Sequence, residues 1–87
     1  MEPIELPIED TIDLHTFQPR EIPDLLEEYI YQARLKGYRE VRIIHGRGIG
    51  VQREIVHSFL KKHPQVLAFR DAADRGSTTA VIATDGR

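Results

Sequence analysis

The sequence predicts an α/β fold in which four strands and two helices follow one another in the order β-α-β-α-β-β. The β-branched apolar residues Val41, Ile43 and Ile44 are typical of a buried strand. Two other stretches, 22–33 and 51–60, repeat their apolar residues at the spacing of an amphipathic helix. Strand–helix–strand units of this kind join parallel strands through right-handed crossovers.

The boundaries of the elements follow from residues that start or stop regular structure. The first strand is expected at 11–15, where apolar and polar residues alternate. Pro23 suits the first turn of the helix that follows, and Gly37 is the natural C′ residue at its end. The remaining elements are expected as a strand at 40–45, a helix at 50–62, a strand at 66–70, a loop at 71–78 and a strand at 79–84.

The same periods predict which apolar side chains meet in the core. The expected core residues are Ile12, Leu14, Leu26, Tyr29, Ile30, Ala33, Val41, Ile43, Ile55, Val56, Phe59, Leu60, Val66, Phe69, Val81 and Ile82.

Composition bounds the class of protein. Eighty-seven residues, 40% apolar and 30% charged, suit one soluble domain, expected at 11–87 after an extended acidic arm at 1–10. The lack of cysteine excludes disulfides and thiolate metal sites. No apolar run has the length of a membrane span, and the acidic start does not resemble a signal peptide. A cytoplasmic monomer without membrane contact is expected.

The net charge of −2 conceals an asymmetry between the two parts of the chain. Residues 1–33 hold nine acids against one base, which gives −8, whereas residues 34–87 hold eleven bases against five acids, which gives +6. A nucleic-acid partner is therefore permitted if the basic residues gather on one side, although the charge alone does not require it.

The stretch from His45 to Gly50 connects the buried strand to the second helix. Glycines at 46, 48 and 50 allow a ligand to approach the backbone, and the first N–H groups of a helix attract anions. His45 and Arg47 add an imidazole and a guanidinium, which favours a phosphate site. The alternative interpretation is a tight connection with two polar surface residues.

Three polar segments are expected at one edge of the sheet: His15, the turn 45–48 and the loop 71–78. If the first three strands are parallel, their carboxyl ends share that edge, where open α/β sheets bind ligands.

Asp13, His15, His45 and Arg47 are the candidates for chemistry at this edge. Two imidazoles near a phosphate suit general acid–base catalysis, and Asp13 either fixes the tautomer of His15 or holds a divalent cation, magnesium or manganese. Alternatively, Asp13 and His15 are polar residues on a solvated sheet face, and His45 is a strand-end histidine bonded to a backbone carbonyl. No pair of histidines has zinc-ligand spacing, so no residue is assigned as a resident metal ligand.

Basic residues of the second helix are further candidates. Arg53, one turn into the helix, suits a second phosphate, and Lys61 and Lys62 near its end are weaker candidates. His57 is expected to be exposed, because it falls off the apolar stripe, and His63 to lie at the helix end, where a cation is favoured.

Ile-Asp-Leu-His at 12–15 and His-Gly-Arg-Gly at 45–48 resemble the two marks of the Smr (small MutS-related) domain family, and the similarity covers 11–84. The resemblance implies a two-layer α/β sandwich with a four-stranded mixed sheet that binds nucleic acid. It implies roles in cleavage or binding for the four candidates named above. Two positions depart from the family pattern: Thr16 replaces a glycine, and the segment 75–79 has a single glycine.

The leading hypothesis is therefore an Smr-type endonuclease that cleaves DNA or RNA in repair or processing. The alternatives are a module that binds branched or single-stranded nucleic acid without cleaving it, and a protein for a small phosphorylated ligand. The residues expected to contact nucleic acid are Gly46, Arg47, Gly48, Gly50, Arg53, Lys61, Lys62, Arg75 and Thr78.

Overall fold

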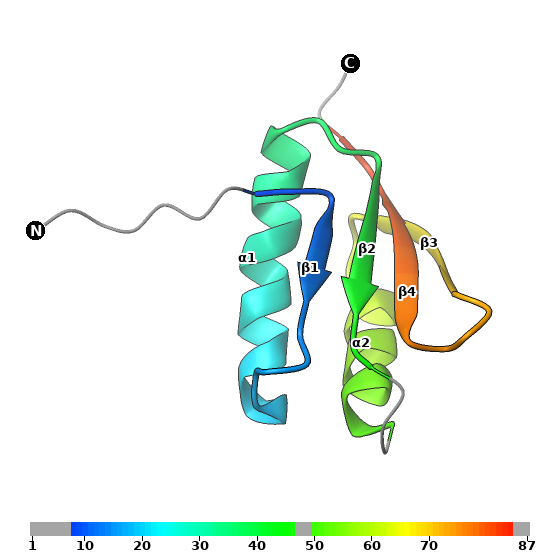
Figure 1. Cartoon of the computed structure of the whole chain (residues 1–87). Coiled ribbons are helices and arrows are strands. Elements are labelled where there is room, and N and C mark those ends of the chain that lie inside the picture. Colours follow the sequence, from blue (N-terminus) through cyan, green and yellow to red (C-terminus); the bar gives the residue numbers. More distant parts are fainter. Residues whose placement is uncertain (1–7, 47–49, 85–87) are drawn as a thin grey trace, which may run out of the picture.

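The computed structural model describes residues 8–46 and 50–84 and shows a two-layer α/β sandwich (Figure 1). The predicted order of strands and helices is confirmed, with a short 3-10 helix added before the first α-helix. The loop between the last two strands is shorter than expected, because β3 extends to Asp71 and β4 begins at Ser77. The elements are β1 (Thr11–Asp13), η1 (Pro19–Glu21), α1 (Ile22–Leu35), β2 (Glu40–Ile44), α2 (Val51–Lys62), β3 (Val66–Asp71) and β4 (Ser77–Ile82).

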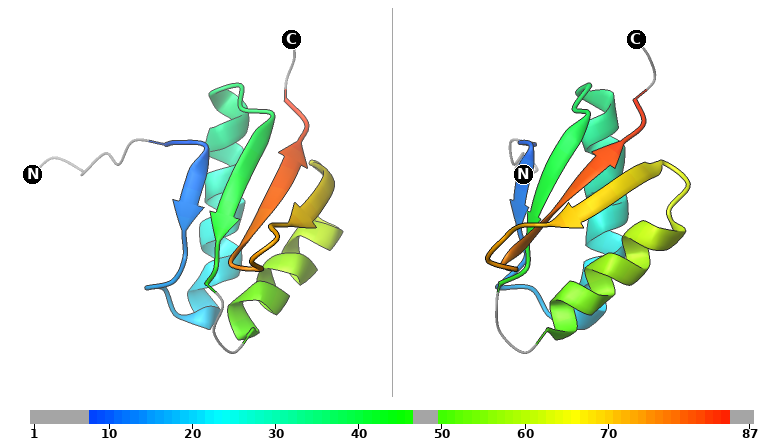
Figure 2. Two further views of the ribbon diagram at one scale, coloured as in Figure 1. Left: turned by 45° about the vertical axis from the view of Figure 1, so that its right-hand side comes forward. Right: turned by 90° about the vertical axis from the view of Figure 1, so that its right-hand side faces the viewer.

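The sheet is mixed, and its strand order is β1-β2-β4-β3 (Figure 2, left). β1 pairs with β2 in parallel, whereas β4 lies between β2 and β3 and is antiparallel to both. β1, β2 and β3 therefore run in the same direction, and their carboxyl ends meet at one edge as predicted. The insertion of β4 means that β2 and β3 are parallel in direction without being neighbours.

Both α-helices cover the same face of the sheet (Figure 2, right). α1 ends in a Schellman motif, in which Gly37 at φ 84° lets the N–H of Tyr38 donate to the carbonyl of Ala33 at 3.0 Å. Neither described helix is long and apolar enough to cross a membrane.

The core fills the space between this pair of helices and the sheet. Ala80 and Ile82 of β4 point into it, so Val81 between them points to the opposite face, and its predicted place in the core is wrong. Ile22, at the start of α1, is an additional core residue. The fully enclosed apolar residues are Leu14, Ile22, Leu26, Tyr29, Ile30, Ala33, Val41, Ile43, Val56, Leu60, Ala80 and Ile82.

Residues 8–10, the described end of the expected N-terminal arm, are joined to the domain by hydrogen bonds. The hydroxyl of Tyr38 donates to the carbonyl of Ile8 at 2.9 Å, and that of Tyr29 donates to the carbonyl of Glu9. Burial raises the pKa of Tyr29 above its ordinary value, so its hydroxyl keeps the proton that it donates.

Candidate functional site

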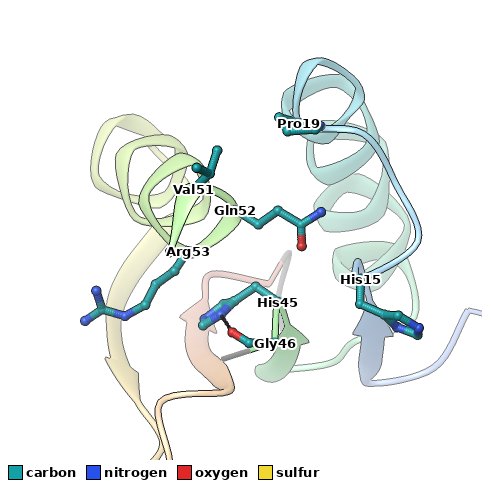
Figure 3. Close-up of a pocket in the computed structure, with 8 residues that line it drawn as sticks. His15, Pro19, His45, Gly46, Val51, Gln52 and Arg53 are labelled. Carbon is teal, nitrogen blue, oxygen red and sulfur yellow. Dashed lines mark hydrogen bonds between the residues drawn. The ribbon is translucent and has the colours of Figure 1, made fainter. Parts of the chain in front are cut away.

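A cleft of about 430 Å³ opens at the edge where the carboxyl ends of β1 and β2 meet the start of α2 (Figure 3). Residues from segments far apart in the sequence therefore line one cavity, as the strand directions predict. The lining residues are His15, Pro19, His45, Gly46, Gly50, Val51, Gln52 and Arg53.

The start of α2 forms one wall of the cleft. Gly50 is the N-cap residue at φ 90°, a left-handed conformation that favours glycine, and no side chain caps the helix there. The first N–H groups of α2 carry the positive end of the helix dipole, so this wall suits an anion. Gln52 ties the wall to the loop after β1, because its Nε2 donates to the carbonyl of Phe17 at 2.7 Å.

His15 lies at the open side of the cleft, bonded to its near neighbour Asp13. Oδ1 of Asp13 accepts hydrogen bonds from the backbone N–H of His15 at 3.0 Å and from its ring Nδ1 at 2.7 Å. The backbone hydrogen bond, followed by the ring hydrogen bond, lowers the pKa of Asp13. Both side chains are exposed, at 64% for His15 and 48% for Asp13, and the ring of His15 turns outward, away from His45 (Figure 3). Asp13 thus fixes the tautomer of His15 with a proton on Nδ1.

His45 lies across the cleft and is almost enclosed, with 5% of its surface exposed. Its backbone N–H and that of Gly46 both donate to the carbonyl of Gly76, at 3.0 and 2.9 Å, so the β3–β4 loop holds the end of β2. The ring Nδ1 is 3.2 Å from the carbonyl oxygen of Gly46, and Nε2 is 2.9 Å from Oγ1 of Thr78.

Behind His45, a group of polar side chains between α2 and the sheet forms what we call the Asp71 network: Asp71, Thr78, His45, His57 and Arg53. Oδ1 of Asp71 accepts a hydrogen bond from the hydroxyl of Thr78 at 2.7 Å and lies 2.8 Å from Nε2 of His57. Oδ2 forms an ion pair with Arg53, whose Nε donates at 2.9 Å and whose Nη2 also donates. No described buried polar side-chain atom lacks a partner.

The network keeps Asp71 ionised. Burial would raise its pKa, but the hydrogen bonds from Thr78, Arg53 and His57 outweigh burial and hold the pKa of this carboxyl well below its usual range. The expectation that His57 is exposed is wrong, because it faces Asp71 and 27% of its side chain is exposed. Asp71 was absent from the predicted site residues. The signal that could have found it is its position at the end of the third strand, on the predicted edge.

The other residues expected to contact nucleic acid lie in different surroundings. Thr78 is fully buried, with its hydroxyl engaged within the protein. Lys61 and Lys62 are exposed at the far end of α2, about 12–14 Å along the helix from Arg53, the last residue of α2 that lines the cleft. Arg47 and Gly48 lie outside the described residues. Within the described part of the chain, no three His, Asp or Glu side chains are placed to hold a metal ion.

The two departures from the Smr pattern differ in structure. Arg75, exposed in the β3–β4 loop, has φ 63° and is the only non-glycine residue among those described with a positive φ. This conformation costs an L-residue about 1–2 kcal/mol and favours glycine. Thr16 has no positive φ, so its backbone conformation is one that any residue adopts.

Comparison with known proteins supports the resemblance. The Smr domain family model matches residues 12–84. The chain is 43% identical over 61 residues to the endonuclease MutS2 of Helicobacter pylori, and 38% identical over 74 residues to that of Solidesulfovibrio magneticus. These matches cover 70% and 84% of this chain but only 8% and 10% of those proteins.

Solved structures agree with this result. The Smr domain of Thermus thermophilus MutS2 is 25% identical, with a TM-score of 0.79, over 83% of this chain and 95% of that domain. The fold is also that of YdaL, a stand-alone small MutS-related protein from Escherichia coli, with a TM-score of 0.81 over 90% of this chain and 67% of YdaL. Because the Smr domain model matches residues 12–84 and solved Smr domains share the fold, the chain belongs to the Smr domain family.

Proposed function

We propose that the cleft binds the sugar–phosphate backbone of nucleic acid and cleaves a phosphodiester bond there. The observation that carries the proposal is the meeting of an uncapped helix N-terminus with two imidazoles at one cavity. The N–H groups of α2 would hold the phosphate, with Arg47 as a predicted further contact, and would stabilise the charge that develops on it.

The two histidines divide the proton transfers. His15 has a proton on Nδ1 and, when neutral, a free lone pair on Nε2, and it lies at the open side of the cleft. His45 lies deeper in the cleft, near the start of α2 that would hold the phosphate. One imidazole takes the proton from the nucleophile and the other gives a proton to the leaving oxygen. The nucleophile is the 2′-hydroxyl on RNA and water on DNA. Both hydrogen bonds between Asp13 and His15 use Oδ1 of Asp13, so Oδ2 is the atom that would hold a divalent cation if cleavage of DNA requires one.

The names of the relatives support this proposal, because both MutS2 proteins described above are named endonucleases. A role in DNA repair or RNA processing, and a cytoplasmic location, belong to the same proposal. A second candidate function is binding without cleavage. The burial of His45 favours it, since 5% exposure leaves little of the ring open to substrate.

Incubation with labelled supercoiled DNA and structured RNA, with and without a chelator, tests both candidates. The expected result is cleavage by the native chain and none by the His15→Gln, His45→Gln double variant, with similar affinity for both. Binding should weaken as salt is added, by about one power of salt concentration for each phosphate contact. Tight binding with no cleavage of either substrate would favour the binding module, and no salt-sensitive binding at all would contradict both.

A further inference from the structure

A groove of about 250 Å³ lies between β1 and α1, and it shares no lining residue with the cleft. Four apolar side chains line it: Ile8, Ile12, Phe17 and Leu25. Three of them rest partly buried against the core, whereas Phe17 is 37% exposed. Apolar surface gathered in one hollow in this way is suited to burying the apolar side chains of a partner.

β1 offers unpaired backbone groups beside this groove. It is an edge strand and pairs with β2 alone among the described strands (Figure 2, left). The carbonyl of Asp10 and the N–H of Leu14 both bond to β2, at 2.8 and 2.7 Å. Because the direction of the backbone groups alternates along a strand, the N–H and C=O groups of Thr11 and Asp13 point to the free edge. Within the described part of the chain nothing pairs with them, so the edge is a template for another strand.

The rim of the groove is acidic. Glu9 and Glu28 line it, and none of its lining residues is Lys, Arg or His. Burial raises the pKa of Tyr29, another lining residue, and the nearby carboxylates of Asp10 and Glu9 raise it further, as expected where negative charge gathers. The groove belongs to the part of the sequence, residues 1–33, that carries a net charge of −8 and has no role in a site for nucleic acid.

We propose that this groove and the free edge of β1 bind an extended basic segment of a partner protein, which adds to the sheet as a fifth strand. The backbone of the segment would pair with Thr11 and Asp13. Its alternate apolar side chains would fill the groove, and its Lys or Arg side chains would face Glu9 and Glu28. The inference goes beyond the proposed function and does not depend on it.

Charge decides between the occupants that such a groove could take. The acidic rim repels the phosphates of nucleic acid. A second copy of this chain would bring its own edge, residues 9–13, which hold three acids and no Lys or Arg, so like charges would meet. Residues 1–7 of the chain hold two glutamates and no Lys or Arg. A different, basic chain complements both the apolar groove and its rim.

A titration of the ¹⁵N-labelled chain with a synthetic peptide of alternating lysine and valine tests the proposal. The amide signals of Thr11 and Asp13 should shift, and the hydrogen exchange of these two N–H groups should slow, because the peptide pairs with them. Two further peptides carry glutamate in place of lysine or serine in place of valine. Both should bind at least about tenfold more weakly, since each lacks one of the two kinds of contact.

Variants of the chain locate the binding. Thr11→Pro removes an N–H from the free edge and leaves the bonds to β2 intact. It should lower the affinity about two- to tenfold relative to Thr11→Val, the matched control that keeps the N–H. Glu9→Gln, Glu28→Gln should weaken binding by a similar factor and reduce its dependence on salt. Glu40→Gln, Glu54→Gln changes the net charge equally at exposed positions outside the groove and should leave the affinity unchanged.

Three results would each overturn the proposal: no binding at millimolar peptide, equal affinity for the basic and the acidic peptide, or signals that move at the cleft and not at β1. Equal affinity of Thr11→Pro and Thr11→Val would do the same. If Thr11→Pro does not fold, an unchanged affinity in Glu9→Gln, Glu28→Gln decides against the proposal. None of these measurements involves nucleic acid, so the proposal and the proposed cleavage can fail separately.

Discussion

The chain builds a carboxylate–imidazole contact twice at the same edge of the sheet, once in the open and once in the interior. In the Asp13–His15 pair the partners are two residues apart, and both are exposed. In the Asp71 network the carboxylate comes from β3, the hydroxyl from β4, one imidazole from the end of β2 and another from α2. The first contact depends on one short strand, whereas the second depends on the whole domain being folded.

This difference has a physical consequence. In the Asp13–His15 pair both side chains are exposed to water, so either group can bond to water when the contact is lost. In the Asp71 network, removing one member leaves the others enclosed with unpaired polar atoms, which is costly. The same kind of contact therefore orients a side chain in one place and also stabilises the fold in the other.

The largest expected effect is on cleavage. His15→Gln and His45→Gln should each lower the rate about 10²–10⁴-fold, because each removes a positioned acid or base, and neither should weaken binding much. Single-turnover rates beside titrations of affinity measure this. His63→Gln is the control, since His63 follows the far end of α2 and lies beside Glu27 at 3.4 Å. A full rate in His15→Gln would show that His15 takes no part in the chemistry.

The next effect is on stability. Asp71→Ala should lower the free energy of unfolding by at least about 1.5–3 kcal/mol, the usual contribution of one hydrogen bond to a charged group, since three side chains lose their partner. Asp13→Ala should change it by less than about 0.5 kcal/mol, as is usual for exposed positions. Urea unfolding of both variants measures the difference. Equal losses would mean that the two contacts do not differ in the way proposed.

The smallest expected effect is on the stability of the fold at acidic pH. A carboxylate whose pKa is lower in the folded than in the unfolded chain stabilises the fold above its unfolded pKa, here close to 3.8, and that stabilisation is lost as the pH falls through the folded pKa. The native chain should therefore lose stability below about pH 4. Asp71→Asn should flatten this decline, and Asp13→Asn should flatten it less, because its carboxylate is half exposed. Unfolding curves measured between about pH 2 and pH 7 test the order, and a steeper decline in Asp71→Asn would contradict it.

The comparison also explains what could be predicted from the sequence. The order of elements, the shared strand ends and the Asp13–His15 contact follow from periodicity and near neighbours. The pairing of β4 between β2 and β3 does not, because nothing local records which strands become neighbours. Asp71 and His57 were missed for that reason: each takes its role from a partner 7 or 14 residues away that only the folded sheet brings close.

For His45, too, the local contact could be predicted from the sequence and the contact with a distant strand could not. Its place at a strand end was predicted correctly, together with a bond to a backbone carbonyl as the alternative interpretation. The structure places Nδ1 3.2 Å from the carbonyl oxygen of Gly46 and also gives the ring a second partner, Thr78, that comes from β4. The prediction for Val81 was wrong for a different reason: Val81 and Ile82 are neighbours in one strand, so their side chains point to opposite faces and cannot both face the core.

The carbonyl of Gly76, which accepts hydrogen bonds from the backbone N–H groups of His45 and Gly46, has a consequence for how the domain is made. During synthesis β1, β2 and α2 emerge before the β3–β4 hairpin, so the residues that line the cleft are present before the segment that holds them in place. Contacts between distant segments also form late, since they must overcome the entropy of closing a long loop. An incomplete domain would thus carry every lining residue without a working cavity. The cavity would form only when the last strand, β4, has joined the sheet.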